Sequence, residues 1–169
     1  MRIRRLTPSD ASAYQALRLA ALQDTPSAFG SSYEEERDRP ESEIEARLAP
    51  QGDRGVFGAF EVDTLIGLVG LRREGMKNRA HKAGIWGMYV APAARGKGIG
   101  RALLLEALAL ARSVPGLRQV NLAANAGNAA AIRLYESAGF KAFGREPGAM
   151  LIDGELHDEV LMCLRFTDG

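Results

Sequence analysis

The fold is decided by one segment, residues 88–101, which reads Met-Tyr-Val-Ala-Pro-Ala-Ala-Arg-Gly-Lys-Gly-Ile-Gly-Arg. It runs from the end of an apolar strand into the start of a helix. Three glycines alternate in it: Gly96, Gly98 and Gly100. Without Cβ atoms the backbone can approach a ligand closely, and the first helical turn presents free N–H groups to it. Three basic residues accompany them: Arg95, Lys97 and Arg101. The segment therefore predicts a site for a phosphate or pyrophosphate, although the glycines alone could also make a tight turn.

Two common phosphate-binding loops do not match this segment. An ATPase loop needs Ser or Thr directly after Gly-Lys, but Gly96-Lys97 is followed by Gly98, so no hydroxyl is available for magnesium. A dinucleotide-binding loop starting at Gly96 or Gly98 would need its last glycine at Arg101 or Leu103. The sequence thus disfavours both ATP and a nicotinamide cofactor.

Outward from this segment, hydrophobic patterns and turn residues predict the other elements. Strands are expected at 3–6, 56–62, 65–71, 83–90, 119–124, 140–143 and 159–166. Helices are expected between Pro8 and Pro26 and at 41–48, 98–112 and 128–138, with a glycine-containing connection at 144–154. This order predicts the α/β (α+β) class, with a single sheet covered by helices.

Length and composition limit the function further. The chain has 169 residues, 46% hydrophobic and 25% charged, which predicts a single domain over 1–169. A net charge of +1 disfavours nucleic acid as a partner. One cysteine, Cys163, and two histidines leave few ligands for a metal, so none is expected; Cys163 is expected to be a buried structural thiol. No export signal is evident, and the apolar stretch 102–111 is too short to cross a membrane, so we expect a cytoplasmic protein.

Two blocks of the sequence resemble the GCN5-related N-acetyltransferase (GNAT) superfamily. The first is the Arg-x-x-Gly-x-Gly pattern of Arg95, Gly98 and Gly100. The second, Asn128 to Phe140, is similar to the family's Asn-x-x-Ala-x-x-Leu-Tyr-x-x-x-Gly-Phe helix. The resemblance implies a mixed, mostly antiparallel sheet of about seven strands flanked by about four helices. It also implies acetyl-coenzyme A (acetyl-CoA) as cosubstrate and direct attack by an amine on the thioester.

The resemblance also implies the residues of the site. Those expected to bind acetyl-CoA are Met88, Tyr89, Val90, Arg95, Gly96, Lys97, Gly98, Ile99, Gly100, Arg101, Asn128 and Ala131. Tyr135 is expected to protonate the leaving thiolate. The acceptor cleft is expected to contain Phe29, Ser32, Tyr33, Glu34 and Trp86. From the residues alone, Asn128 could equally be a helix N-cap and Tyr135 a core aromatic.

Several residues and several amines are candidates for the general base and the acceptor. The resemblance implies that some lysine-acetylating members carry a glutamate on the strand before the glycine-rich loop, but segment 85–90 carries no carboxylate here. This difference disfavours a lysine of a folded protein as acceptor and favours a small molecule or an α-amine. Candidate bases, each of which could instead be a solvated surface residue, are Glu34, Glu35, Glu36, Glu74 and His81. The acidic run 34–36 would suit a cationic amine by its charge, but such a run is also typical of a solvated face. A non-catalytic acyl-CoA binding or sensing module is the alternative, and a homodimer is possible.

Overall fold

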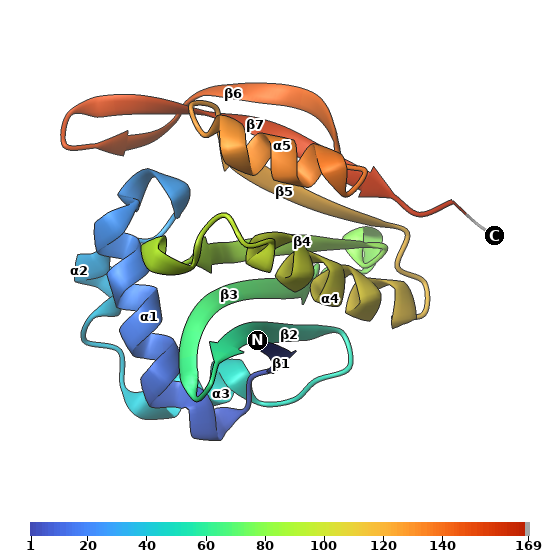
Figure 1. Ribbon diagram of the computed structural model, residues 1–169. Coiled ribbons are helices and arrows are strands. Elements are labelled where there is room, and N and C mark those ends of the chain that lie inside the picture. Colours follow the sequence, from blue (N-terminus) through green and yellow to red (C-terminus); the bar gives the residue numbers. More distant parts are fainter. Residues whose placement is uncertain (168–169) are drawn as a thin grey trace.

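A computed structural model describes residues 1–167, which form one seven-stranded sheet (Figure 1). The strands lie in the order β1-β2-β3-β4-β5-β7-β6. Their bounds are Arg2–Arg5 (β1), Arg54–Glu61 (β2), Thr64–Arg73 (β3), Lys82–Val90 (β4), Gln119–Asn125 (β5), Lys141–Ile152 (β6) and Glu155–Arg165 (β7). Every neighbouring pair is antiparallel except β4 and β5, which are parallel. The prediction of a mixed, mostly antiparallel sheet is confirmed.

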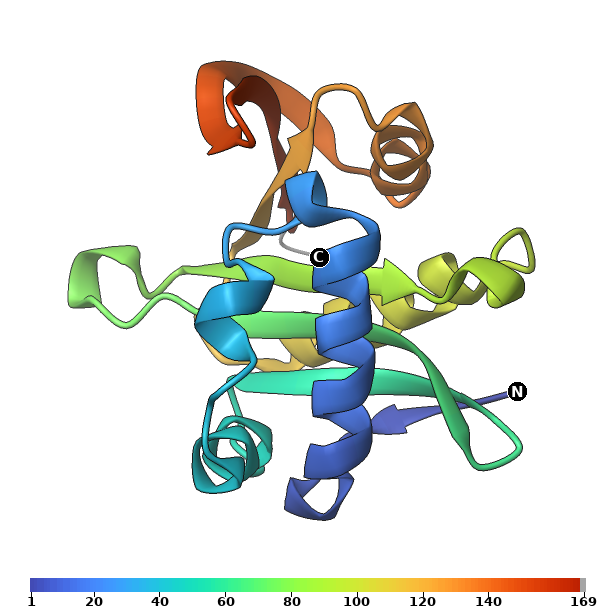
Figure 2. The ribbon, with the colours of Figure 1, turned by 90° about the vertical axis from the view of Figure 1, so that its left-hand side faces the viewer.

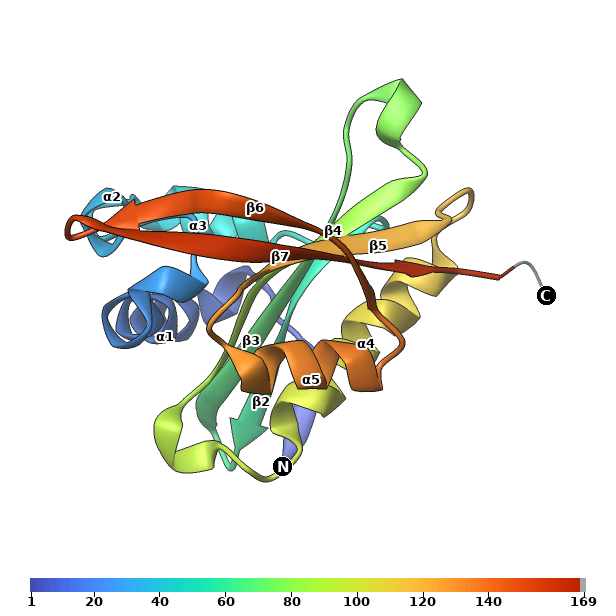
Figure 3. The ribbon, with the colours of Figure 1, turned by 90° about the horizontal axis from the view of Figure 1, so that it is seen from above.

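Helices cover both faces of this sheet. Their bounds are Ala11–Asp24 (α1), Tyr33–Glu36 (α2), Glu41–Leu48 (α3), Ile99–Ser113 (α4) and Ala129–Ser137 (α5). Figures 2 and 3 show α1, α2 and α3 on one side of β2–β4, and α4 with α5 on the other. Short 3-10 helices begin at Pro8, Pro26, Lys77 and Pro92. No helix within residues 1–167 is long and apolar enough to span a membrane.

Each face of the sheet has its own hydrophobic core. On one face α4 buries residues three or four apart, including Leu103, Leu104 and Ala107, against Val69 and other strand residues. This spacing gives a helix one apolar side. On the other face Leu6, Tyr14, Ile44, Val56 and Leu68 pack together. Truncating a fully buried leucine such as Leu103 would cost about 2–5 kcal/mol of unfolding free energy.

The strands β4 and β5 separate soon after they start. In the described residues they pair over three positions only, Lys82 with Gln119 to Gly84 with Asn121. Farther along, β4 carries a bulge at Gly87, which has a φ of +66°, and the register with β3 shifts there. A bulge bends a strand and turns it away from its neighbour. The backbone of residues 85–90 is consequently left open toward β5.

The C-terminal hairpin and the helix count differ from the prediction. The expected loop 144–154 is instead the second half of β6 and the turn into β7. Gly144, Pro147 and Gly148 are typical loop residues. However, β6 is an edge strand whose register with β7 shifts between 142 and 144 and between 146 and 150, and an edge strand tolerates glycine and proline at such shifts. A fifth helix, α2, arises because Ser32 and Glu35 form a capping box. Cys163 is half-buried rather than fully buried, and burial raises the pKa of its thiol.

Candidate functional site

The glycine-rich loop forms the N-terminus of α4, at the end of β4. Gly96 and Gly98 have φ of +78° and +79°, which residues with a Cβ rarely adopt, and Gly98 is the N-cap. A Cβ at either position would have no atom within 4 Å, so the space outside the loop is open. Within the described residues the backbone N–H groups of 99–101 have no hydrogen-bond acceptor. The loop therefore offers an accessible row of donors to an anion.

The basic side chains of the loop serve two different purposes. The Arg95 side chain turns back, with Nε 2.9 Å from the Val90 carbonyl oxygen and Nη2 2.9 Å from Asp24 Oδ2. Arg101 donates from Nη1 to Ser137 Oγ on α5, at 2.8 Å. Lys97 is exposed and forms no ion pair in the part of the chain that the structure describes. Two of the three expected anion ligands thus brace the loop, and Lys97 remains available.

Gly100 differs from the other two glycines. A Cβ there would lie 3.3 Å from Leu134 Cδ2, a tight contact. Together with the bond between Arg101 and Ser137, this contact joins the start of α4 to α5. Gly100 therefore lies against α5, whereas Gly96 and Gly98 face open space.

The end of β4 is anchored to α1. Tyr89 is buried and donates from its hydroxyl to Asp24 Oδ2 at 2.9 Å, while the Arg95 guanidinium lies over the Tyr89 ring. Burial and the nearby Asp24 raise the pKa of Tyr89, and the bonds from Tyr89 and Arg95 lower the pKa of Asp24. Met88 and Val90 pack against the α4-side core. The expected acetyl-CoA residues of β4 thus lie on the strand edge that opens toward β5.

The expected catalytic tyrosine lies on α5. Asn128 caps this helix, its Oδ1 accepting from Ala131 N at 3.1 Å, so the N-cap reading of Asn128 is confirmed. Tyr135 is buried, and its ring meets Phe140 edge-on at 5.9 Å between centroids. Burial raises the pKa of Tyr135 to about 12. With this pKa the phenol is neutral near pH 7, and its hydroxyl forms no hydrogen bond with another group among residues 1–167.

The expected acceptor residues fall into two hollows on the α1–α3 side. Phe29, Ser32, Tyr33 and Glu34 line one of about 680 Å³, which is also lined by residues 149–153 at the tip of the β6–β7 hairpin. Trp86 lines a second one of about 800 Å³ instead. Ser31 borders both hollows, which makes them neighbours. The structure therefore separates Trp86 from the other four residues.

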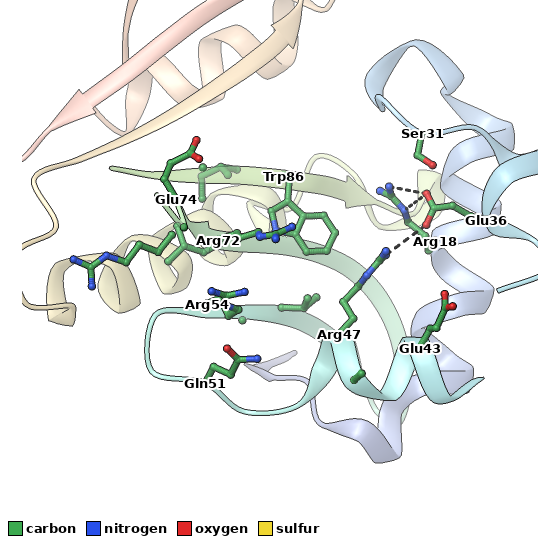
Figure 4. Close-up of a pocket in the computed structure, with 18 of the residues that line it drawn as sticks. Arg18, Ser31, Glu36, Glu43, Arg47, Gln51, Arg54, Arg72, Glu74 and Trp86 are labelled. Atoms are coloured by element: carbon green, nitrogen blue, oxygen red, sulfur yellow. Dashed lines mark hydrogen bonds and ion pairs between the residues drawn. The ribbon is translucent and has the colours of Figure 1, made fainter. Parts of the chain in front are cut away.

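The second hollow, which we call the arginine pocket, is rich in positive charge (Figure 4). The arginines that line it are Arg18, Arg39, Arg47, Arg54, Arg72 and Arg73. The carboxylates that line it are Glu36, Glu43 and Glu74. Residues 84–86 of β4 form its wall toward the centre of the sheet. The sequence as a whole is nearly neutral, so this positive excess is a local feature.

Glu36 is the most buried of the candidate bases, with 1% of its surface exposed. Its Oε2 accepts from Arg18 Nε and Nη2, at 3.1 and 2.9 Å, and its Oε1 lies 3.5 Å from Arg47 Nη1. Burial alone would raise the pKa of Glu36, but the bonds and charge of Arg18, with Ser31 and Arg47, outweigh it and lower the pKa. The expectation that 34–36 could be one solvated acidic face is thus wrong for Glu36. A carboxylate held this way is a weak base.

The sequence did contain a signal for this buried cluster. Arg18 stands on the same side of α1 as Tyr14, Ala21 and Leu22, all of which are buried. An arginine at such a position indicates a buried ion pair, because an unpaired charge there would be costly. Of the other candidate bases, Glu35 is used in the α2 capping box, and Glu34, Glu74 and His81 are exposed. Residues 1–167 hold no group of three His, Cys, Asp or Glu able to bind a metal.

Comparison with known proteins agrees with this geometry. A model of the Acetyltransferase (GNAT) family matches residues 18–140. The mycothiol acetyltransferase of Thermobispora bispora is 38% identical over 145 residues, which are 83% of this chain and 46% of that protein. The chain spans less than half the length of the curated relatives it matches.

Two solved structures share the entire fold. The ribosomal-protein-alanine N-acetyltransferase from Brucella melitensis is 26% identical, with a TM-score of 0.81 over 98% of this chain and 100% of that one. The Salmonella typhimurium protein yncA, solved with its cofactor acetyl-CoA, is 25% identical, with a TM-score of 0.82 over 100% of this chain and 95% of that one.

Proposed function

The chain belongs to the acetyltransferase (GNAT) family, and on that premise we propose that it transfers the acetyl group of acetyl-CoA to a primary amine. The observation that carries the proposal is the opening between β4 and β5 beside the free N–H groups at the start of α4. An extended thioester needs both features: backbone groups along its length and an anion site for its pyrophosphate. Acetyl-CoA is the cosubstrate of this family.

The chain's own residues fit that cosubstrate. The open space over Gly96 and Gly98 suits a pyrophosphate, and Lys97 would add a charge to the backbone donors. Residues 88–90 would offer backbone groups to the pantetheine arm. Asn128, whose Oδ1 is used in the helix cap, would contribute only its Nδ2.

We propose direct transfer in a ternary complex. The lone pair of the amine attacks the thioester carbonyl carbon, the carbon–sulfur bond breaks, and the sulfur leaves as a thiolate. Tyr135 would give that thiolate its proton and regain one from water, and the nitrogen would lose one to water or to a base. Because a thiol has a pKa of only about 8.5, its thiolate is a fair leaving group and the acid has a modest role. Cys163 forms no part of this route.

For the acceptor we propose a small molecule or an α-amine. An α-amine is neutral in roughly one molecule in ten at pH 7, whereas a lysine side chain is neutral in about one in 2,500. A site without a strong base can therefore acetylate an α-amine far more readily than a lysine side chain. The pairing of Glu36 with two arginines is in keeping with this argument, since it leaves no basic carboxylate at that position.

Two measurements test the proposal in sequence. Thermal unfolding with coenzyme A, ATP or NAD as additive should give a rise in Tm with coenzyme A alone. Release of free thiol from acetyl-CoA should then be scored across a broad panel of amines. Binding of coenzyme A without thiol release with any amine would favour a non-catalytic acyl-CoA sensor. If coenzyme A does not bind, both the transferase and the sensor are rejected.

A cytoplasmic location, a homodimer and a single domain over 1–169 stay predictions from the sequence.

A further inference from the structure

The arginine pocket contains buried hydrogen-bond donors without acceptors. Arg18 has 7% of its surface exposed, and its Nη1 is buried without a partner among the described residues. The same is true of Nε1 of Trp86, whose indole lies against Gly70. A buried polar group without a hydrogen-bond partner destabilises the folded protein. Since both atoms can only donate, a ligand that satisfies them must present an acceptor.

Two further arginines lie side by side in the lining of the pocket. Arg54 on β2 is in register with Arg72 on β3, so the two side chains stand side by side on the same face (Figure 4). Like charges directly opposite each other destabilise a sheet. Arg54 has Asp53 within 3.2 Å, but no described carboxylate lies within ion-pair distance of Arg72. An anion between them would remove this repulsion.

The nearest buried carboxylate does not neutralise the pocket. Glu36 is shared by Arg18 and Arg47, so one negative charge serves two positive ones. The Arg47 guanidinium also lies over the Trp86 ring, 5.6 Å from its centroid, which directs it toward the pocket (Figure 4). The remaining carboxylates, Glu43 and Glu74, are exposed. Six arginines against three carboxylates leave the lining of the pocket with an excess of positive charge.

The pocket also adjoins the proposed site of acetyl transfer. Arg18 Nη1 lies 3.5 Å from the position that a Cβ on Gly87 would take, and Gly87 is the bulge where β4 becomes open. A group bound to Arg18 would thus lie next to the opening between β4 and β5. A volume of about 800 Å³ is enough for a small molecule.

We propose that the arginine pocket binds an oxyanion on the acceptor, so that the substrate is a small primary amine that also carries a carboxylate or phosphate group. This inference rests on the proposed function for the identity of the second substrate. It disfavours polyamines and other polycationic amines, which the arginines would repel. The amine end of the substrate points to Gly87, and the oxyanion lies farther into the pocket, at Arg54 and Arg72.

Matched acids and amides test this inference. The twenty standard amino acids and their carboxamides are offered with acetyl-CoA, along with O-phosphoserine, phosphoethanolamine and ethanolamine. For at least one pair the acid should be acetylated about 10-fold more efficiently, in kcat/KM, than its neutral counterpart. A carboxamide has the lower amine pKa, so amine availability alone would produce the opposite preference. The phosphorylated compounds distinguish a phosphate from a carboxylate as the preferred oxyanion.

Arginine variants locate the effect in the pocket. Arg72→Gln and Arg54→Gln should each raise KM for the preferred acid about 10-fold and leave KM for acetyl-CoA unchanged. Arg79→Gln removes the same charge from an exposed residue outside the pocket and should change neither. Thermal unfolding of each variant confirms that it is folded.

A direct binding measurement separates this inference from the proposed function. Calorimetric titration of the acids and amides into the protein with coenzyme A present reports binding without turnover. Binding of an acid that Arg72→Gln abolishes, without any thiol release, would support the pocket and reject the transferase. Three outcomes would overturn the inference. The first is equal kcat/KM for acids and amides, and the second is an equal loss of kcat/KM for both in the arginine variants. The third is that no acid binds.

Discussion

The guanidinium of Arg95 lies 2.9 Å from the carboxylate of Asp24, which ties the loop before α4 to the C-terminus of α1. The same Asp24 oxygen accepts from the Tyr89 hydroxyl, and Arg95 Nε donates to the Val90 carbonyl. One exposed carboxylate thus connects the proposed acceptor side to the proposed acetyl-CoA side. The ion pair between Asp24 and Arg95 is expected to affect the position of the loop more than the stability of the fold, because exposed ion pairs stabilise little.

Asp24→Asn should therefore weaken acetyl-CoA binding by no more than about fivefold, with little change in Tm. Titration calorimetry with acetyl-CoA measures the first quantity and thermal unfolding the second. Asp38→Asn, which removes another exposed carboxylate bonded to an arginine, is the control and should leave affinity unchanged. A large loss of Tm without a change in affinity would make Asp24 a purely structural residue.

Gly98→Val should abolish acetyl-CoA binding in a protein that still folds. Gly98 has a φ of +79° and open space in front of it, so a side chain both strains the loop and occupies the proposed pyrophosphate site. Gly116→Val is the matched control, since Gly116 has the same φ of +79° at the other end of α4. Similar losses of stability are expected in both variants. Unchanged acetyl-CoA affinity in Gly98→Val would refute the site.

Tyr135→Phe should lower kcat while KM for acetyl-CoA stays nearly constant, because only the leaving thiolate needs the proton. The loss should be smaller than the ~10²-fold typical of acid catalysis on poorer leaving groups. Since burial raises the pKa of Tyr135 to about 12, its phenol stays protonated and no loss of kcat from its ionisation is expected below about pH 11. Equal changes in kcat and acetyl-CoA affinity would instead identify Tyr135 as a packing residue.

Glu36→Gln should cost about 3–5 kcal/mol of unfolding free energy, because it leaves Arg18 buried without its countercharge. The pKa of Glu36 is lowered in the folded state, so its stabilisation is fully present above its unfolded pKa of about 4.3 and is lost as pH falls through the folded value. Urea unfolding at several pH values measures the free energy of unfolding of both proteins. The difference in this free energy between Glu36→Gln and wild type should become smaller below about pH 4. Glu34→Gln, an exposed neighbour, should show no such difference at any pH.

The pH profile of kcat/KM should follow the acceptor amine. If no side chain acts as general base, the activity rises through the pKa of the amine and the profile shifts when an amine of different pKa is used. Profiles for two or more acceptors, measured by thiol release, test this. A limb that persists across acceptors and disappears in Glu74→Gln or His81→Asn would identify an enzymic base. Efficient acetylation of internal lysines in folded proteins would also count against the prediction.

What the sequence by itself determined is local. The turn from β4 into α4 follows from Gly96 and Gly98. Both residues have a positive φ, which glycine adopts readily because it has no Cβ, and this preference does not depend on the rest of the fold. The start of α5 follows in the same way from Asn128, whose side chain bonds three residues along. Both were predictable, as were most of the strands, because alternation and turn residues act within a few positions. The mixed, mostly antiparallel pairing of these strands was implied by the family resemblance and not by the local pattern.

Only the tertiary structure decided the features that join distant segments. The opening between β4 and β5 depends on a bulge at Gly87 and on where β5 diverges. The arginine pocket gathers Arg18, Arg47 and Arg72 from α1, α3 and β3, and their spacing along the chain says nothing of their proximity. The edge strand β6 tolerates Pro147 because one of its sides has no ladder partner among the described strands. Long-range packing sets such contacts, so the proposed acceptor site forms only once the chain has folded.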